Sequence, residues 1–235
     1  MTNFTTWRSL IDGEEISAIP DGGMLHKYRA DETEYDDGDP VDPWPDIEGD
    51  ADLEDVGGSP TFRVDNDGHQ YIEFDGDAAI GSEMDGVTDP PFTLVYVLEW
   101  TGGSGKYFGG TGDSSILTSD GGDTRNLTGE LSDEWRMWSD GDSDTAGTIE
   151  QDKRYVASFV FDGSNSYLRY NGEVVDMSPG EVTGADHILI GGSDAGSNRI
   201  SANYFEHIAY EDQKTESELE AIESTLADDW NIDLD

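Results

Sequence analysis

Residues 154–175 carry the most constraining pattern in the chain, because two apolar runs are each closed by turn residues. Residues 156–161 (VASFVF) form the first run, which Asp162-Gly163 ends, and Asn171-Gly172 ends the second. Such runs between Asp-Gly and Asn-Gly are typical of antiparallel strands joined by tight turns. A strand that is apolar at consecutive positions is covered on both faces. We therefore predict that residues 156–161 lie centrally in a sheet packed against a second sheet.

The same strand signals recur along the chain. Further strands are predicted at residues 24–30, 60–64, 70–74, 92–100, 187–192 and 203–211, and shorter candidates at 102–110, 114–119 and 134–139. Near the end the apolar spacing changes to three or four residues, at Leu219, Ile222, Leu226 and Trp230. Thr215 and Glu218 precede this stripe with the spacing of a capping box. The sequence thus predicts an all-β, two-sheet antiparallel sandwich with a C-terminal α-helix.

The charge of the chain indicates the solvent in which it works. The sequence holds 54 acidic and 12 basic residues, which gives a formal net charge of −42, and the acids are spread over every segment. Salt at 1 M shortens the Debye length to about 3 Å and removes most of the self-repulsion. We therefore predict a high-salt environment. No basic patch could neutralise nucleic-acid phosphates, and no apolar run is long enough to insert into a membrane.

Residues 1–23 are predicted to form a segment of their own, ahead of a domain at 24–235. Its apolar residues include Phe4, Trp7, Leu10 and Ile11. Two alternatives are open for this segment. It adds an edge strand to the domain, or it is an assembly arm that docks on a neighbouring subunit. In the second case the four apolar residues would make the contact and the protein would be a homo-oligomer.

A metal site is one interpretation of the acidic loops. Asp140, Asp142 and Asp144 alternate as the first ligands of an EF-hand loop do. The sixth and twelfth positions of that loop should be Gly and Glu, but Thr145 and Gln151 occupy them. The EF-hand pattern therefore fails. Calcium held by the three aspartates in another loop geometry and solvated acidic loops without an ion are the two alternatives, and no cofactor is expected to be required.

Six short motifs, taken in order, resemble those of laminin-G-like, concanavalin A-like jelly-roll domains, especially the versions found in structural proteins of tailed viruses. The matching segments are residues 28–31 (YRAD) with 44–46 (WPD), 72–76 (IEFDG), 91–93 (PFT), 162–163 (DG) with 171–172 (NG), 190–192 (IGG), and 206–210 (EHIAY) with 219–232. The resemblance covers residues 24–235 and implies a jelly-roll sandwich.

The resemblance, together with the charge, also implies a function. We expect a virion surface structural protein of a haloarchaeal tailed virus, either a capsid turret or decoration subunit or a tail-fibre or receptor-binding subunit. It would contact other virion proteins and host glycans. The first residues lack the basic and apolar regions of a secretory signal, which fits assembly in the host cytoplasm. A cellular carbohydrate-binding or adhesion module and a glycan hydrolase are alternatives that the same fold allows.

A glycan site would combine exposed aromatic rings with a few fixed polar groups. The candidates in or beside predicted loops are Trp44, Tyr107, Trp135 and Trp138, with Tyr35 as a further one. Trp135 and Trp138 are an odd number of residues apart. In a strand they would face opposite sides, one toward the core and the other outward.

Enzymatic activity is not expected. Retaining glycosidases hold two carboxyl groups about 5 Å apart, which on a strand requires acids two residues apart. Glu216, Glu218 and Glu220 have this spacing, but they lie in the predicted helix, where such residues diverge. No predicted strand shows the pattern.

Overall fold

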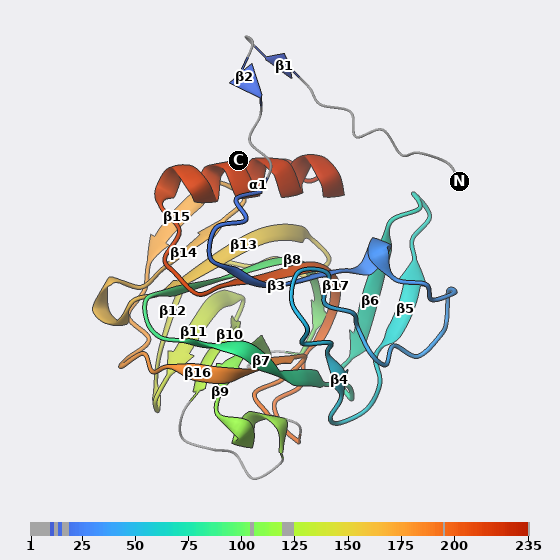
Figure 1. Ribbon diagram of the computed structural model, residues 1–235, viewed down its shortest axis with the longest axis horizontal. Coiled ribbons are helices and arrows are strands. Elements are labelled where there is room, and N and C mark those ends of the chain that lie inside the picture. Colours follow the sequence, from blue (N-terminus) through green and yellow to red (C-terminus); the bar gives the residue numbers. More distant parts are fainter. Residues whose placement is uncertain are drawn as a thin grey trace.

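Two antiparallel sheets lie face to face, and one α-helix covers the outer side of the larger sheet (Figure 1). The computed structural model describes residues 10–11, 14–15, 19–103, 106–118, 125–194 and 196–234. Within these residues the sheets contain eight and seven strands. The two-sheet antiparallel sandwich with a C-terminal helix is therefore confirmed. No helix in the described ranges is long and apolar enough to cross a membrane.

The larger sheet is built around three long central strands. Its order is β15 (Glu173–Asp176), β14 (Tyr167–Tyr170), β13 (Arg154–Phe161), β8 (Phe92–Gly102), β17 (Ser201–Tyr210), β6 (Gln70–Asp75) and β5 (Thr61–Val64). The eighth strand, β3 (Met24–Arg29), pairs with the second half of β17. The predicted central position of 156–161 is confirmed, because β13 pairs with β8 and β14. The Asn171-Gly172 turn has positive φ at both residues, as a type I′ turn requires.

The smaller sheet lies across the main core from the larger one. Its order is β12 (Asp142–Thr148), β11 (Glu134–Ser139), β10 (Arg125–Leu131), β9 (Tyr107–Gly112), β16 (Ala185–Ile190), β7 (Ile80–Thr88) and β4 (Glu54–Asp55). Short 3₁₀ helices are η1 (Ala30–Glu32), η2 (Ser114–Leu117) and η3 (Gly163–Asn165). The strand predicted at 114–119 is wrong. Asp113 accepts a hydrogen bond from the Ser115 amide, which caps η2 and favours the helical turn.

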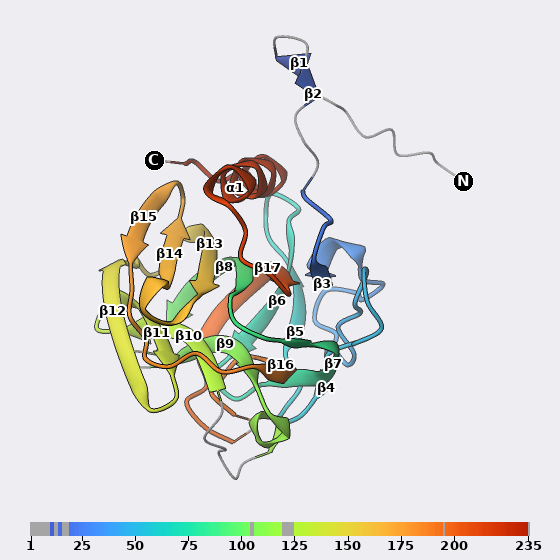
Figure 2. The same cartoon turned by 60° about the vertical axis from the view of Figure 1, so that its left-hand side comes forward.

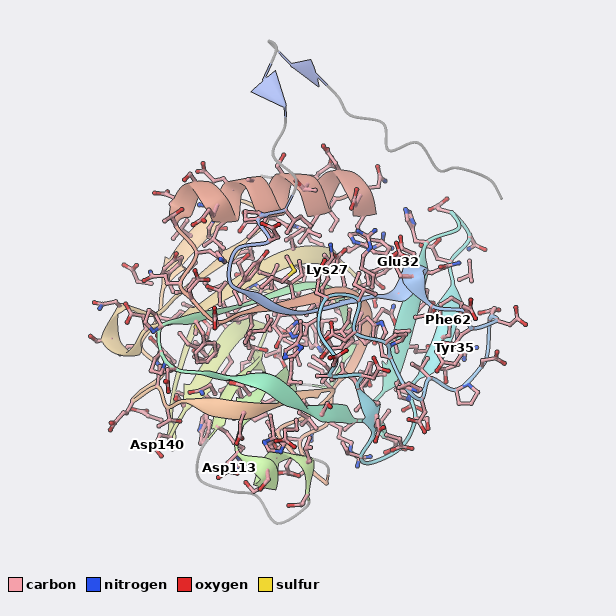
Figure 3. The ribbon with its side chains drawn as sticks, viewed as in Figure 1. Lys27, Glu32, Tyr35, Phe62, Asp113 and Asp140 are labelled. Atoms are coloured by element: carbon pink, nitrogen blue, oxygen red, sulfur yellow. The ribbon has the colours of Figure 1, made fainter. Side chains whose placement is uncertain are left out.

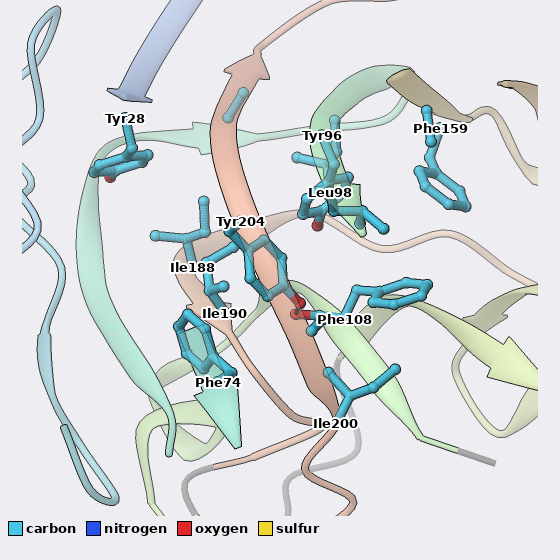
Figure 4. Packing of buried hydrophobic residues seen from close by; sticks show 14 of the residues in the cluster. Tyr28, Phe74, Tyr96, Leu98, Phe108, Phe159, Ile188, Ile190, Ile200 and Tyr204 are labelled. Atoms are coloured by element: carbon cyan, nitrogen blue, oxygen red, sulfur yellow. Dashed lines mark hydrogen bonds between the residues drawn. The ribbon is translucent and has the colours of Figure 1, made fainter. Parts of the chain in front are cut away.

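The main core fills the space between the sheets. Figure 4 shows aromatic and aliphatic side chains from both sheets meeting there, with Tyr204 of β17 reaching toward β9. The Tyr204 hydroxyl donates a hydrogen bond of 2.6 Å to the Phe108 carbonyl, and its ring lies 4.9 Å from that of Phe74. The buried hydroxyl thus has its partner and links the two sheets directly.

The helix α1 (Glu216–Trp230) makes a second core with the outer face of the larger sheet. Figure 2 shows it nearly end-on above that sheet. The predicted stripe of Leu219, Ile222, Leu226 and Trp230 is buried against it, and the Thr215–Glu218 capping box is present. The outer face of the smaller sheet is partly covered as well, because Ile116 and Leu117 of η2 pack there with Leu127 and Leu189.

The predicted arm is described only in part. Two short strands, β1 (Leu10–Ile11) and β2 (Glu14–Glu15), pair with each other. Ile19 packs on the helix-side core, and the carbonyls of Pro20 and Gly23 accept hydrogen bonds from Tyr210 and Glu211. Residues 19–23 are therefore tied to the sandwich. Phe4 and Trp7, and the side chains of Leu10 and Ile11, lie outside the described residues, so their assembly role stays a prediction.

Candidate functional site

A hollow of about 250 Å³ opens on the outer face of the smaller sheet. Strands β9, β10 and β11 form its floor, and the loop between β16 and β17 forms one wall. Its lining combines two aromatic rings, one aliphatic residue and five polar residues: Tyr107, Arg125, Leu127, Trp138, Ser193, Asp194, Ser197 and Asn198. The hollow thus offers many hydrogen-bonding groups beside a small aromatic surface.

Strand alternation explains why these side chains face outward. On β11, Trp135 and Met137 point into the main core, and Trp138 points to the other side. On β9, Phe108 is a core residue and Tyr107 belongs to the outer cluster. The odd spacing of Trp135 and Trp138 therefore separates them as predicted.

A glycine on the central strand allows the aromatic floor to be covered by a cation. Gly129 of β10 pairs with Arg136 of β11 on one side and with Tyr107 of β9 on the other. A Cβ at Gly129 would overlap the carbonyl oxygen of Lys106. Without a side chain there, the Arg136 guanidinium crosses β10 and its Cζ lies 4.6 Å from the centre of the Tyr107 ring.

Arg125 ties the sheet to the wall of the hollow. Its Nη1 donates to the Ser193 carbonyl at 3.1 Å and lies 3.3 Å from Oδ2 of Asp194. Its Cζ also lies 5.5 Å from the centre of the Trp138 ring. One side chain thus orients both the loop and the tryptophan ring.

Asp194 is held as a carboxylate inside the wall. It accepts hydrogen bonds from the Ser197 hydroxyl at 2.6 Å and the Gly196 amide at 2.8 Å. Burial by itself would raise the pKa of Asp194, but these hydrogen bonds and Arg125 outweigh it and hold the pKa below its ordinary value. Burial raises the pKa of Tyr107 against the pull of Arg136 and Arg125, so its hydroxyl is protonated at neutral pH.

The structure places the predicted glycan residues in two different environments. Tyr107 and Trp138 both line the hollow, but Trp138 is partly exposed while Tyr107 is only 6% exposed. Trp44 and Trp135 are completely buried, which corrects their assignment to a glycan surface. Trp44 packs against Tyr28 under its loop, and Trp135 contacts Phe108 and Tyr155 between the sheets. Tyr35 lies elsewhere, beside Phe62 (Figure 3), and its hydroxyl donates to the Pro43 carbonyl.

The predicted metal ligands are not brought together. Asp140 and Gly141 form the tight turn between β11 and β12, both with positive φ, and Asp140 lies at the surface (Figure 3). Asp144 accepts hydrogen bonds from the amides of Thr145 and Ser178 instead. Across the part of the chain that the structure describes, no three acidic or histidine side chains gather as a metal would require. A hairpin, rather than a loop that wraps an ion, is what this segment forms.

Most polar residues of the hollow were not predicted. Arg125 begins β10, a strand that lacks a clear apolar pattern, and residues 193–198 (SDAGSN) read as an ordinary turn-rich connection. The available signal was the length of the polar segment between the predicted strands 187–192 and 203–211, since irregular loops often carry function. Only the pairing of β9, β10 and β11 shows that this loop meets Tyr107 and Trp138.

Comparisons with known proteins identify the fold. No protein-family model and no curated protein matches the sequence. The Trypanosoma rangeli sialidase in complex with sialic acid matches with a TM-score of 0.64 at 15% identity, over 94% of this chain and 36% of that chain. The binding domain of botulinum neurotoxin serotype D/C matches with a TM-score of 0.61 at 8% identity, over 87% of this chain and 52% of that chain.

These matches establish a concanavalin A-like sandwich and confirm that part of the resemblance inferred from the motifs. At such low identity the likeness concerns the fold alone. The chain spans about a third to a half of the length of the structures that it matches.

Proposed function

We propose that this chain is a carbohydrate-binding module and that the saccharide occupies the hollow over β9, β10 and β11. The observation that carries the proposal is the meeting of Tyr107 and Trp138 with a fixed set of polar groups in one hollow. The apolar C–H face of a sugar ring can pack on the partly exposed Trp138 ring, next to the buried Tyr107, and its hydroxyl groups can pair with the polar wall.

The size of the hollow limits the ligand. Pockets for drug-sized molecules measure about 300–1,000 Å³, and this hollow is smaller, at about 250 Å³. We therefore expect it to hold one sugar unit, or the terminal unit of a longer glycan that extends into solvent.

Binding without hydrolysis is the better account of the chemistry. Glycosidases need two carboxyl groups, about 5–5.5 Å apart for retention or about 6.5–9.5 Å apart for inversion. Asp194 is the one carboxylate among the described lining residues, and Arg125 and Ser197 already engage it. It can accept a hydrogen bond from a sugar hydroxyl, but a second acid that would complete a catalytic pair does not line the described hollow.

The setting of this module follows from the sequence resemblance. We place it on the surface of a virion, as a turret, decoration or tail-fibre subunit that contacts host glycans, and a cellular adhesion module is the alternative. The matched structures support the binding role, since one is a sialidase in complex with sialic acid and the other is a toxin's binding domain. Mass spectrometry of purified particles would test the setting, and finding the chain on cells but not on particles would favour the alternative.

The binding role is tested by titration calorimetry in molar KCl, with saccharides first selected on a glycan array. Trp138→Ala should weaken binding at least tenfold, because truncating an aromatic anchor costs about 2 kcal/mol or more. Tyr35→Ala is the matched control, since Tyr35 is a half-buried aromatic residue away from the hollow. Binding of no saccharide, or equal effects of the two substitutions, would contradict the proposal.

A further inference from the structure

We propose that the saccharide taken by this site is anionic, a sugar that carries a carboxylate or a sulfate, and that Arg136 recognises its charge. This inference rests on the proposed function and specifies the class of its ligand. It follows from which basic residues of the chain pair with a carboxylate and which do not.

Basic residues are scarce in this chain, and most of the described ones are paired with an acid. Acidic residues outnumber them 54 to 12, so a cation without an acidic partner is unexpected. In the described ranges eight basic residues have a carboxylate within 4.0 Å: Lys27, Arg29, Arg63, Arg125, Lys153, Arg154, Arg169 and Lys214. Arg136 has no such partner among the described residues. Glu134, two residues earlier on the same strand face, accepts a hydrogen bond from Thr145.

The unpaired guanidinium is fixed beside the hollow. It stacks on Tyr107, whose ring lines the hollow, and the missing side chain at Gly129 makes this contact possible. The Nε of Arg136 is buried and finds no hydrogen-bond partner among the described residues. Arginine presents five N–H donors in a planar fork that suits carboxylate and sulfate oxygens. The buried Nε is out of a ligand's reach, but the side chain is partly exposed and its terminal Nη groups make no hydrogen bond among the described residues, so they are the donors that a ligand could engage.

The other charged residues of the site, Arg125 and Asp194, are paired with each other, unlike Arg136. Arg125 is already neutralised by Asp194, at 3.3 Å. An anionic group would be repelled by Asp194 and attracted toward Tyr107, the lining residue on whose ring Arg136 stacks from outside the hollow. The sugar hydroxyls would then meet Ser197 and Asn198 in the wall. The ligand thus has one preferred direction in the site.

The net charge of −42 sets the conditions of the test. At low salt this charge repels any anion from the whole surface. At 1 M salt the Debye length is about 3 Å, so the repulsion from distant acids is screened and the direct contact with Arg136 remains. Binding should therefore be measured in molar KCl, where the local cation decides the preference.

The experiment compares charged and neutral forms of the same saccharide by titration calorimetry. One pair of probes is tetragalacturonate and its methyl ester, and the other is a sulfated galactose oligomer and its desulfated form. The natural chain should prefer at least one charged form about tenfold or more, since a hydrogen bond to a charged group contributes about 1.5–3 kcal/mol. The pair that shows the preference tells carboxylate from sulfate.

Two substitutions locate the preference. Arg136→Gln should bring the ratio of charged to neutral affinity close to one, and Arg136→Lys should restore it in part. Arg63→Gln is the matched control, because it removes the same charge from the larger sheet, where Arg63 pairs with Glu73. Arg63→Gln should leave the ratio unchanged. Thermal unfolding of each variant in the same buffer checks that it is folded.

Three results would contradict the inference or the proposed function. Equal binding of charged and neutral forms by the natural chain would overturn the anionic ligand and leave the carbohydrate-binding function standing. A preference that survives in folded Arg136→Gln would overturn the role of Arg136. Binding of no saccharide in either form would overturn both the inference and the proposed function.

Discussion

His207 is a histidine that the fold keeps neutral. Its side chain is fully buried, and its ring stacks on Tyr28 and Tyr96, with centroids 6.0 and 4.3 Å away. The Val95 carbonyl can only accept a hydrogen bond, so Nδ1 of His207 must donate to it across 2.9 Å. Burial lowers the pKa of His207 to about 3, against the opposing effect of this hydrogen bond.

This environment makes the stability of the fold depend on pH. The unfolded histidine titrates near pH 6.5 and the folded one near pH 3, so between these values only the unfolded state takes up the proton. The stabilisation is complete above about pH 6.5 and is lost as the pH falls toward 3. From pH 7 to pH 5 this single group should cost about 2 kcal/mol.

His207→Phe removes this contribution without leaving a cavity. We expect the free energy of unfolding, measured by urea titration in molar KCl at pH 7 and pH 5, to fall by about 2 kcal/mol more in the natural chain than in the variant. The absolute stability of the variant does not enter this comparison. Identical losses in the two proteins would show that His207 does not titrate in this way.

Helix α1 shows how a short local signal sets the boundary of an element. The Thr215 hydroxyl donates to Oε2 of Glu218 at 2.6 Å, and the Thr215 amide donates to the same oxygen at 2.8 Å. Asn231 ends the helix in the left-handed conformation, with φ of 53°. The Trp230 indole N–H donates to the buried Glu206, which fixes the last turn on the larger sheet.

Thr215→Ala should remove the cap and lower the free energy of unfolding by about 1 kcal/mol. Urea unfolding followed by tryptophan fluorescence measures this change. Ser224→Ala is a suitable control, since Ser224 is exposed in the same helix and lies far from the cap, whereas the Ser217 hydroxyl is 3.4 Å from that of Thr215. Equal effects of the two substitutions would mean that the capping box contributes nothing measurable.

Three of the strands that the sequence predicts poorly, β7, β9 and β10, contain glycine in their interior. β13 and β8 are rich in apolar, β-branched and aromatic residues, and strong turn signals flank them. β7 and β10 were not predicted, and β9 (YFGGTG) was only a short candidate. A Cβ at Gly110 would overlap the carbonyl oxygen of Asn126, so this glycine is required by the approach of the neighbouring strand. That requirement is tertiary and leaves no local pattern.

Some residues of the candidate site could be predicted from the sequence and others could not. The aromatic half, Tyr107 and Trp138, could be predicted from residue type and alternation. The tryptophans Trp44 and Trp135 show the limit of this reasoning, because residue type does not tell a ring that plugs the core from one that lies open. Arg125 and Asp194 are 69 residues apart in sequence, and only the folded sheet brings them together.

At the scale of the whole molecule, repulsion between acids must be weighed against the attraction of ion pairs. Salt screens both, but the 54 acids outnumber the 12 bases, so repulsive pairs dominate. Exposed ion pairs contribute only about 0–1 kcal/mol each, and their loss in salt is small. Screening should therefore stabilise the fold. We expect the midpoint of thermal unfolding to rise steadily as KCl is raised from about 0.1 M toward molar concentrations.

Differential scanning calorimetry at a series of KCl concentrations measures this rise, and the same series in NaCl is the control. Equal effects of the two salts would identify general screening as the cause. A midpoint that stays constant or falls with salt would contradict the prediction of a protein adapted to high salt.

Truncation tests the prediction that residues 1–23 form an assembly arm. Residues 19–23 are held by Tyr210, Glu211 and the helix-side core, so a truncation that spares the sandwich must begin at Ile19. If Phe4, Trp7, Leu10 and Ile11 make a contact between subunits, light scattering in molar KCl should give an oligomer for the full chain. The chain from Ile19 onward should then be a monomer.

Several copies of a single-sugar site would also bind a glycan-coated surface far more tightly than one copy, because each further contact is made within the same complex. The truncated chain should therefore keep its affinity for a free oligosaccharide and lose retention on an immobilised glycan. Unfolding curves of both chains in the same buffer would confirm that the sandwich is intact. A monomeric full chain would exclude self-assembly through the arm, and avidity would then have to come from attachment to a different protein.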